Sequence, residues 1–241
     1  MSAPALSVIV PTLNEEACIE GFLEQVSRFL ESRGPSWEIV VVDDGSSDGT
    51  VALVERRMAA DRRIRLVPQP HRGKGAAVRR GMLAAQGEWR LMTDADLSVS
   101  PAEWAAFLDA AAASGAEVVI GSREAPGSRR IGEPVARHLI GRTFNWVVRL
   151  FTLPGIHDTQ CGFKLLRADV AQRVFPHVSL DGFAFDVELL FLSRRAGFRV
   201  REVGVVWVCR KDSRVSIRRG AAAFGDVLRI RLNAWRGFYS S

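Results

Sequence analysis

The sequence has few cysteines, few histidines and no long apolar run, and each shortage excludes a class of protein. The three cysteines, Cys18, Cys161 and Cys209, are widely spaced and odd in number, so they predict neither a disulfide framework nor a zinc site. The four histidines show no metal-ligand spacing either. No apolar stretch approaches the roughly 20 residues that a membrane span needs, and no signal-like segment precedes the first apolar run. We therefore expect a protein of the reducing cytoplasm that neither is secreted nor spans a membrane.

Charge is distributed unequally along the chain. Residues 1–120 contain 12 Lys and Arg against 17 Asp and Glu, whereas residues 121–241 contain 21 against 10. An acidic half suits a nucleotide site that works with a cation, and a basic half suits an anionic partner such as a phosphorylated acceptor or an acidic membrane surface. A nucleic-acid partner is not expected, because the basic residues lack interleaved aromatic residues for base stacking.

Apolar, β-branched runs alternate with segments of helical periodicity through the first half. With 241 residues, 47% of them hydrophobic, the chain can bury the core of one domain, residues 1–241. Alternation of strand and helix forces parallel pairing through right-handed crossovers, which predicts a three-layer α/β/α sandwich. The predicted strands are 6–11, 37–42, 64–67, 89–92 and 117–120, and the predicted helices are 15–33, 76–85, 101–113 and one that starts near residue 47.

In the second half of the chain, strands and helices no longer alternate regularly, and arginine is more frequent. Residues 123–133, rich in Gly, Pro and Arg, are predicted to form a mobile loop. Residues 135–153 have the pattern of a helix with apolar side chains on more than one stripe, and residues 216–239 repeat this basic, amphipathic pattern. Each is either a buried core helix or a helix that lies in a membrane interface.

Two carboxylates follow the strand at 89–92, and they predict a metal site. Ligands of open parallel sheets bind beyond the carboxyl ends of the strands, and alternate residues of an extended segment project the same way, so Asp94 and Asp96 could face one ion. Mg²⁺ and Mn²⁺ take one or two carboxylates together with water and substrate phosphates. A solvated turn is the alternative for these two acids.

Three further segments are predicted to converge on the same edge: residues 11–15, 43–48 and 73–75. An acid after the second strand accepts hydrogen bonds from a ribose or a pyrimidine imide, and Asp43 is our candidate, with helix capping as the alternative. Gly73 and Gly75 permit close backbone approach to a phosphate, and Lys74 compensates its charge, unless the segment is simply the turn that starts a helix.

These motifs resemble the family 2 glycosyltransferases of GT-A fold, a Rossmann-like sandwich with a mainly parallel sheet. The resemblance rests on residues 8–15, 41–50, 73–75 and 94–96, and residues 121–123, 158–164 and 182–188 are similar to the polyprenyl (dolichyl) phosphate glycosyltransferases, especially the dolichyl-phosphate β-glucosyltransferase type. It implies a nucleotide-sugar half (1–122), an acceptor half (123–215) and a C-terminal amphipathic helix (216–241). The residues implied for the nucleotide pocket are Pro11, Asn14, Glu15, Asp43 and Asp44, those for diphosphate and metal are Asp94 and Asp96, and those for the acceptor phosphate are Arg123, Arg137 and Lys164.

The reaction expected from this resemblance is inverting, metal-dependent transfer of a hexose, glucose from UDP-glucose, to a polyprenyl phosphate. A phosphate monoester is already ionised, so no base is required. If one were, Asp158 is the candidate, with N-capping or orientation of Lys164 as its alternative roles. Asp186, which is expected to face the site, is the second candidate for a base or for a residue that orients the site. The alternatives are a soluble or polysaccharide hydroxyl acceptor and transfer of mannose from GDP-mannose. We expect peripheral association with the cytoplasmic face of the membrane; the oligomeric state stays open.

Overall fold

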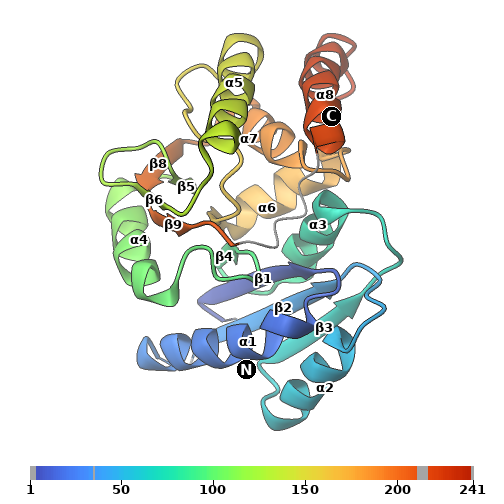
Figure 1. The fold of residues 1–241 in the computed structure, drawn as a ribbon, viewed down its shortest axis with the longest axis vertical. Coiled ribbons are helices and arrows are strands. Elements are labelled where there is room, and N and C mark those ends of the chain that lie inside the picture. The colour runs from blue at the N-terminus through green and yellow to red at the C-terminus, as the bar shows by residue number, and fades with distance from the viewer. Residues whose placement is uncertain (1–3, 35, 211–216, 240–241) are drawn as a thin grey trace.

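The computed structural model is built around a seven-stranded sheet with helices on both faces (Figure 1). It describes residues 4–34, 36–210 and 217–239, the side chains of residues 136, 137, 140 and 217–223 excepted. The strands lie in the order β3-β2-β1-β4-β7-β5-β8. Their bounds are β1 Leu6–Thr12, β2 Trp37–Asp43, β3 Ile64–Pro68, β4 Trp89–Met92, β5 Val118–Ser122, β7 Lys164–Arg167 and β8 Val200–Gly204.

Alternation of buried side chains divides the core into two layers. In β1, Val8 and Val10 pack toward one face of the sheet and Ile9 packs toward the other, because successive side chains of a strand point to opposite faces. The helices on the first face are α1 Glu16–Ser32, α2 Thr50–Ala60 and α4 Pro101–Ser114, and those on the second are α3 Lys74–Ala84, α6 Ala168–Val174 and α7 Phe185–Arg195. The predicted α/β/α sandwich is confirmed, and only α2 begins clearly later than expected.

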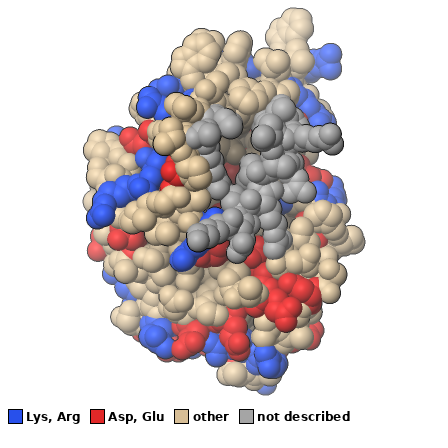
Figure 2. Space-filling model, viewed as in Figure 1, with Lys and Arg blue, Asp and Glu red and all other residues tan. Residues whose placement is uncertain are grey.

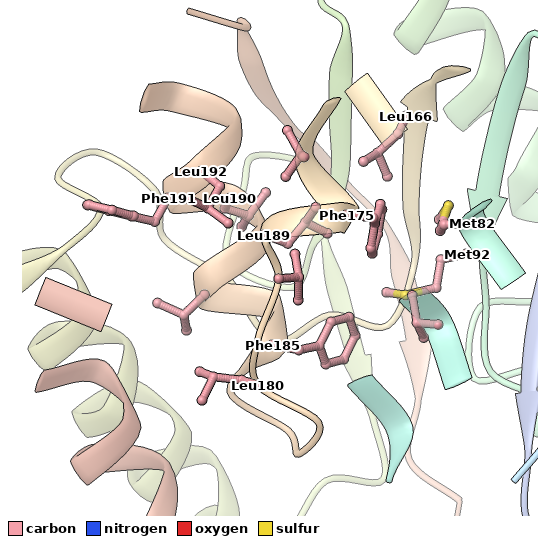
Figure 3. Close-up of a cluster of buried hydrophobic side chains, with 14 of the residues drawn as sticks. Met82, Met92, Leu166, Phe175, Leu180, Phe185, Leu189, Leu190, Phe191 and Leu192 are labelled. Carbon is pink, nitrogen blue, oxygen red and sulfur yellow. The ribbon is translucent and has the colours of Figure 1, made fainter. Parts of the chain in front are cut away.

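The core of the second face is large and apolar. Figure 3 shows Phe175, which follows α6 in the short helix η1 Phe175–His177, together with Phe185 and Leu189 of α7, directed toward Met92 of β4 and Met82 of α3. Phe175, Phe185 and Leu189 have no exposed surface. This packing fixes α7 against the sheet, and α7 carries the acidic residues Asp186 and Glu188.

One strand departs from the predicted parallel pairing. β7 lies between β4 and β5 and is antiparallel to both, whereas the other neighbouring pairs of the sheet are parallel. The reason is the long excursion between Ser122 and Lys164, which returns the chain to the sheet from the opposite end without a simple crossover helix. The register places Lys164 beside Met92, at the end of β4.

The prediction of a mobile loop over 123–133 is wrong in part. Strand β6 Arg129–Ile131 pairs in parallel with β9 Val206–Val208 and forms a second, two-stranded sheet. The partner strand is more than 70 residues away in the sequence, so no local pattern indicates the pairing. Arg130 is held by Glu124 at 2.7 Å and by Glu133 at 2.5 Å, which accounts for the order of this arginine-rich segment.

Helices α5 Val135–Phe151 and α8 Ile217–Trp235 project together from one end of the molecule (Figure 1). They contact each other through the rings of Phe144 and Phe224, whose centroids are 5.2 Å apart. Neither is the buried core helix that was one of our two alternatives, since each leaves large apolar side chains exposed. These are Val135, Leu139, Trp146, Leu150 and Phe151 on α5 and Leu228, Leu232 and Trp235 on α8. In the part of the chain that the structure describes, no helix has the length and apolar composition to cross a membrane.

Candidate functional site

The four predicted segments do converge at one edge of the sheet. A series of contacts runs through them, from the end of β1 to the end of β4. Ser47 N donates to Asn14 Oδ1 at 2.7 Å, Gly73 N donates to Asp44 Oδ2 at 2.9 Å, and Lys74 Nζ donates to Asp94 Oδ1 at 2.5 Å. The predicted convergence of the four segments is confirmed, and their use as one binding site stays a prediction.

Asp43 and Asp44, adjacent in sequence at the end of β2, have different surroundings. Asp43 is buried, and its Oδ2 accepts from the backbone N–H groups of Gly45 and Ser46 at 3.1 and 3.0 Å. Its Oδ1 is buried without a hydrogen-bond partner among the described residues. Such an oxygen is suited to accept a hydrogen bond from a ligand. Asp43 does not cap α2, because the N–H of Thr50 donates to Asp48 instead.

Asp44 is fully engaged by the protein. It accepts hydrogen bonds from Gln69 Nε2 at 2.6 Å, His71 Nδ1 at 2.7 Å and the backbone N–H groups of Arg72 and Gly73, both at 2.9 Å. Burial acts to raise the pKa of Asp44, but these hydrogen bonds outweigh it and lower the pKa. Asp44 thus secures the loop that leads into α3, and a direct contact of Asp44 with the nucleotide stays a prediction.

The segment after β1 is shaped by contacts with the start of α2. Asn14 has a left-handed backbone, with φ of 53°, and its N–H donates to Ser46 Oγ at 2.8 Å. The N–H of Glu15 donates to Thr50 Oγ1 at 2.8 Å. Pro11 lies within β1, next to Val42 of β2. Pro11, Asn14 and Glu15 therefore border the same edge as Asp43, as the resemblance implies, and their contact with a nucleotide stays a prediction.

Gly73 and Gly75 lie at the turn that starts α3, which was one of our two alternatives. A Cβ at Gly73 would collide with the carbonyl oxygen of Asp181, and one at Gly75 would collide with the carbonyl oxygen of Leu180. The N–H of Gly75 donates to Asp181 O at 2.8 Å. The two glycines therefore permit close approach of the protein's own backbone at residues 180–181. Their close approach to a phosphate stays a prediction.

Lys74 lies between these glycines and is directed at Asp94. Burial acts to lower the pKa of Lys74, but the charges of Asp94, Asp186 and Asp96 outweigh it and raise the pKa. Lys74 is therefore a fixed positive charge beside the acidic pair. A diphosphate placed there meets both a cation and the carboxylates that would hold its metal.

Asp94 and Asp96 follow β4, but not in an extended segment. The strand ends at Met92, and the chain turns at residues 95 and 96. Asp94 and Asp96 are therefore not alternate residues of one extended strand, which corrects our prediction, and the shared ion stays a prediction. Asp96 accepts from Ser98 through both oxygens, from the backbone N–H at 2.9 Å and from Oγ at 2.8 Å. Each carboxylate oxygen keeps a further lone pair.

The donor chemistry fits a hard divalent cation. Within the described residues no group of three or more His, Cys, Asp and Glu side chains could hold a metal. Mg²⁺ and Mn²⁺ do not require such a set, since one or two carboxylates suffice when substrate phosphates and water complete the coordination. Asp94 and Asp96 provide that number.

Lys164 and Asp186 form a buried ion pair beneath this edge. Lys164 Nζ lies 2.6 Å from Asp186 Oδ1 and donates to the carbonyl oxygen of Cys161 at 2.5 Å. Lys164 has no exposed surface and Asp186 has almost none. Burial raises the pKa of Asp186, although the charges of Lys164 and Lys74 oppose it. The structure thus directs Lys164 at Asp186, and its predicted contact with an acceptor phosphate would require that pair to open.

Arg123 forms an ion pair with Asp158, and its guanidinium does not face an open surface. Nε and Nη2 of Arg123 donate to the two carboxylate oxygens at 2.7 and 2.8 Å, and the guanidinium lies over the ring of Trp207, 5.3 Å from its centroid. Burial acts to raise the pKa of Asp158, but the charge and hydrogen bonds of Arg123 lower it to about 2. Asp158 therefore orients Arg123, a role that differs from the predicted base, N-cap or partner of Lys164. Arg137 lies in α5, and its side chain is outside the described residues.

Sequence reasoning missed the residues that shape the surroundings of Asp94. A small pocket opens beside it, lined by Thr93, Asp94, Ser98, Val99, Cys161, Gly162, Phe163 and Trp207. A Cβ at Gly162 would collide with Asp94 Oδ2, so this glycine sets how closely the two segments approach. Arg210 Nε donates to the carbonyl oxygen of Asp96 at 3.0 Å. Gly162 lies within the 158–164 motif, but nothing local in the sequence indicates that it contacts Asp94.

The charge asymmetry of the sequence is visible on the surface. Figure 2 shows acidic side chains gathered toward the middle and lower right of this face, whereas the upper end has uncharged side chains bordered by Lys and Arg. That upper end belongs to α5 and α8, by comparison with Figure 1. The face therefore presents an acidic region and a basic, apolar region at different places.

Comparison with known families gives one clear match. The model of the family described as Glycosyl transferase family 2 matches residues 7–175. This range includes the ends of β1, β2 and β4, the start of α3, and the Arg123–Asp158 and Lys164 positions.

Similar proteins and structures point the same way. The chain is 32% identical to a dolichyl-phosphate beta-glucosyltransferase of Dictyostelium discoideum, over 97% of this chain and 76% of that protein. It is 30% identical to the dolichyl-phosphate beta-glucosyltransferase of Saccharomyces cerevisiae, over 97% of this chain and 76% of that protein. Among solved structures, glucosyl-3-phosphoglycerate synthase from Mycobacterium tuberculosis, in complex with Mn²⁺, UDP and phosphoglyceric acid, superposes with a TM-score of 0.66 at 22% identity, over 96% of this chain and 78% of that one. The last likeness bears on the fold alone.

Proposed function

Because the chain belongs to glycosyl transferase family 2, we propose that it transfers glucose from UDP-glucose to a polyprenyl phosphate of the dolichyl type. In this reaction an oxygen of the acceptor phosphate forms a bond to the anomeric carbon of glucose. The bond from that carbon to the diphosphate breaks, and UDP leaves with the electron pair. Attack from the side opposite the leaving group inverts the anomeric centre.

The observation that carries this proposal is the state of the two candidate bases. Asp158 is held by Arg123 through two hydrogen bonds, and Asp186 is held by Lys164 at 2.6 Å. A base that accepts a proton from a hydroxyl must be near its reacting group and free to take the proton, and both carboxylates would first have to leave a buried ion pair. A phosphate acceptor is ionised near neutral pH and has no such requirement.

The residues at the sheet edge have complementary tasks in this proposal. Asp43 Oδ1 would accept a hydrogen bond from the nucleoside, and Lys74, which donates to Asp94, would offset the charge of the diphosphate. Asp96 and Asp94 would hold Mg²⁺ or Mn²⁺, which when bound neutralises charge on the departing diphosphate. Lys74 and the metal carboxylates lie together, so donor binding and leaving-group stabilisation use the same residues.

We also propose that the enzyme works as a peripheral protein at the cytoplasmic face of a membrane. The acceptor is a lipid, and the end formed by α5 and α8 exposes Trp146 to 57% and Trp235 to 87%. Exposed arginines accompany them, among them Arg142 on α5 and Arg229 on α8. Apolar side chains with basic residues around them are the composition of a helix that lies in a bilayer interface.

The test is direct transfer. Purified protein is incubated with labelled UDP-glucose, UDP-N-acetylglucosamine or GDP-mannose, each with vesicles that contain a polyprenyl phosphate, with and without EDTA. We expect a glucose-labelled lipid from UDP-glucose alone, and none with EDTA or with Asp96→Ala. Labelling of a water-soluble hydroxyl acceptor, with none of the lipid, would overturn the proposed acceptor.

A further inference from the structure

Glu188 is a buried carboxylate that the proposed chemistry does not use. It lies on α7, has no exposed surface and accepts four hydrogen bonds. Three come from the loop of residues 178–182: Ser179 N at 2.8 Å, Ser179 Oγ at 2.7 Å and Leu180 N at 2.8 Å. The fourth comes from the hydroxyl of Tyr239 at 2.6 Å, just beyond the end of α8.

The 178–182 loop is held equally firmly from the side of the donor site. Asp181 forms ion pairs with Arg72 at 2.9 Å and Arg79 at 3.1 Å, and its carbonyl oxygen accepts from Gly75 N at 2.8 Å. Arg79 Nη1 also donates to Val178 O at 2.7 Å. The loop is thus the surface against which the start of α3 is placed, and that start carries Lys74.

These contacts form a continuous path from α8 to the metal carboxylates. Tyr239 donates to Glu188, and Glu188 accepts hydrogen bonds from the loop. The loop in turn accepts a hydrogen bond from Gly75, the residue after Lys74, which donates to Asp94. The close approach at Gly73 and Gly75 leaves no space for adjustment, because a single Cβ would collide with loop carbonyls. A shift of the loop must therefore move the start of α3.

Tyr239 and its neighbour Phe238 have opposite environments. Tyr239 is 8% exposed, and its ring lies beside Phe191 of α7, whereas Phe238 is 62% exposed. The same short segment therefore carries one aromatic side chain inward to Glu188 and one outward, just after the end of α8. That helix itself exposes Leu228, Leu232 and Trp235. Uptake of the outward side chain by a bilayer would restrain the segment that also carries the inward one.

We infer that Glu188 is a positioning residue for the donor site, and that α8 acts on that site through Tyr239 and Glu188. The inference rests on the proposed function for the identity of the donor. The occupant of the α8 surface is a lipid bilayer. By linkage, a membrane that favours the seated Tyr239 raises the affinity for the nucleotide, and the nucleotide raises the affinity for the membrane by the same factor.

The experiment measures binding of UDP with Mn²⁺ by calorimetry, with no acceptor present. Tyr239→Phe removes the hydroxyl alone and keeps the ring in place. Ser193→Ala is the matched control, since Ser193 is a buried hydroxyl on α7, the helix that carries Glu188. It donates to Leu189 O at 2.8 Å and has no side-chain hydrogen bond to the loop among the described residues. We expect Tyr239→Phe to weaken UDP binding about fivefold, at the lower end of typical coupling between sites, with a melting temperature similar to that of Ser193→Ala.

A second arm adds vesicles of zwitterionic and anionic phospholipid that contain no polyprenyl phosphate. We expect the vesicles to tighten UDP binding to the wild type and to Ser193→Ala, but not to Tyr239→Phe. Equal UDP affinity in all three proteins, or an equal effect of vesicles on all three, overturns the inference while glucosyl transfer can still proceed. A wild type that binds GDP and not UDP overturns the proposed donor instead.

Discussion

Arg123 and Asp158 form a bidentate ion pair that could not be predicted from the sequence. Besides the two side-chain hydrogen bonds, the backbone N–H of Arg123 donates to Asp158 Oδ2 at 2.8 Å. Asp158 has no exposed surface, so the guanidinium is the counter-ion that permits its charge to be buried. The pair fixes the residue that follows β5 against residues 157–160.

Asp158→Asn is expected to destabilise the protein, because it leaves the guanidinium of Arg123 buried without its counter-ion. Removal of one partner of a buried pair costs about 3 kcal/mol or more of unfolding free energy. Urea denaturation at pH 7 measures it. The control is Asp169→Asn, which breaks an exposed bidentate ion pair with Arg167, whose two hydrogen bonds are each 2.7 Å long. Exposed ion pairs contribute about 1 kcal/mol of unfolding free energy at most. Equal losses in the two variants would contradict the structural role.

The same pair makes stability depend on pH in a defined window. Against the effect of burial, Arg123 lowers the pKa of Asp158 from 3.8 to about 2. A depressed carboxyl pKa contributes stability above the unfolded-state value, and this contribution is lost as the pH falls through the folded-state value. The difference in unfolding free energy between wild type and Asp158→Asn should therefore shrink as the pH falls from 5 to 2. A difference that stays constant over this range would exclude the ionised pair.

Asp96→Ala is expected to abolish transfer and leave the fold intact. The variant loses a carboxylate of the proposed metal site, and that loss lowers the rate at least about 100-fold, or about 3 kcal/mol in the barrier. Circular dichroism and a melting curve verify folding, and initial rates with UDP-glucose measure the effect. Asp109→Ala, at an exposed pair with Arg33, is the control carboxylate. A near-wild-type rate for Asp96→Ala that survives EDTA would place the metal elsewhere or exclude it.

Gly162→Ala is expected to impair the donor site through one methyl group. The added Cβ collides with Asp94 Oδ2, so Asp94 must rotate away from Lys74 or the chain must shift. We expect weaker binding of UDP with Mn²⁺, measured by calorimetry. Gly141→Ala is the control, because a Cβ at Gly141 in α5 meets nothing within 4 Å. Unchanged affinity in Gly162→Ala would mean that the geometry of Asp94 does not matter for the donor.

The sequence predicts those features that depend on local pattern. The strands β1, β2 and β4 and the segments that follow them could be located because parallel strands with crossover helices bring their carboxyl ends to one edge. Asp43, Lys74 and Asp94 lie at that edge in the structure, as predicted, whereas their contacts with a donor stay predictions.

Pairings between distant segments could not be predicted. Lys164 appears in the sequence as a cation at the end of a motif, and its burial against Asp186 depends on the antiparallel insertion of β7 and on the packing of α7. Gly75 shows a similar limit, since a glycine at a helix start serves a phosphate or a backbone carbonyl equally well. The structure resolves each case through a contact between segments that lie far apart in the chain.

Trp235→Ser is expected to weaken binding to membranes. Trp235, the last residue of α8, is 87% exposed. Loss of a side chain of this size costs about 2 kcal/mol of transfer free energy, or about 30-fold in partitioning. Sedimentation with vesicles of anionic phospholipid measures it. Leu83→Ser is the control, because Leu83 is an exposed apolar residue, 45% exposed, on α3 rather than on α5 or α8.

The salt dependence of membrane binding distinguishes its electrostatic contribution from its apolar contribution. Attraction of exposed arginines such as Arg142 and Arg229 to an anionic surface is screened as ionic strength rises, whereas the contribution of Trp235 is apolar. Raising the salt concentration should therefore reduce sedimentation of the wild type and of Trp235→Ser by similar factors. If Leu83→Ser and Trp235→Ser lose binding equally, or if no protein sediments at any salt concentration, then α8 is not the surface that meets the membrane, and a water-soluble acceptor becomes the better proposal.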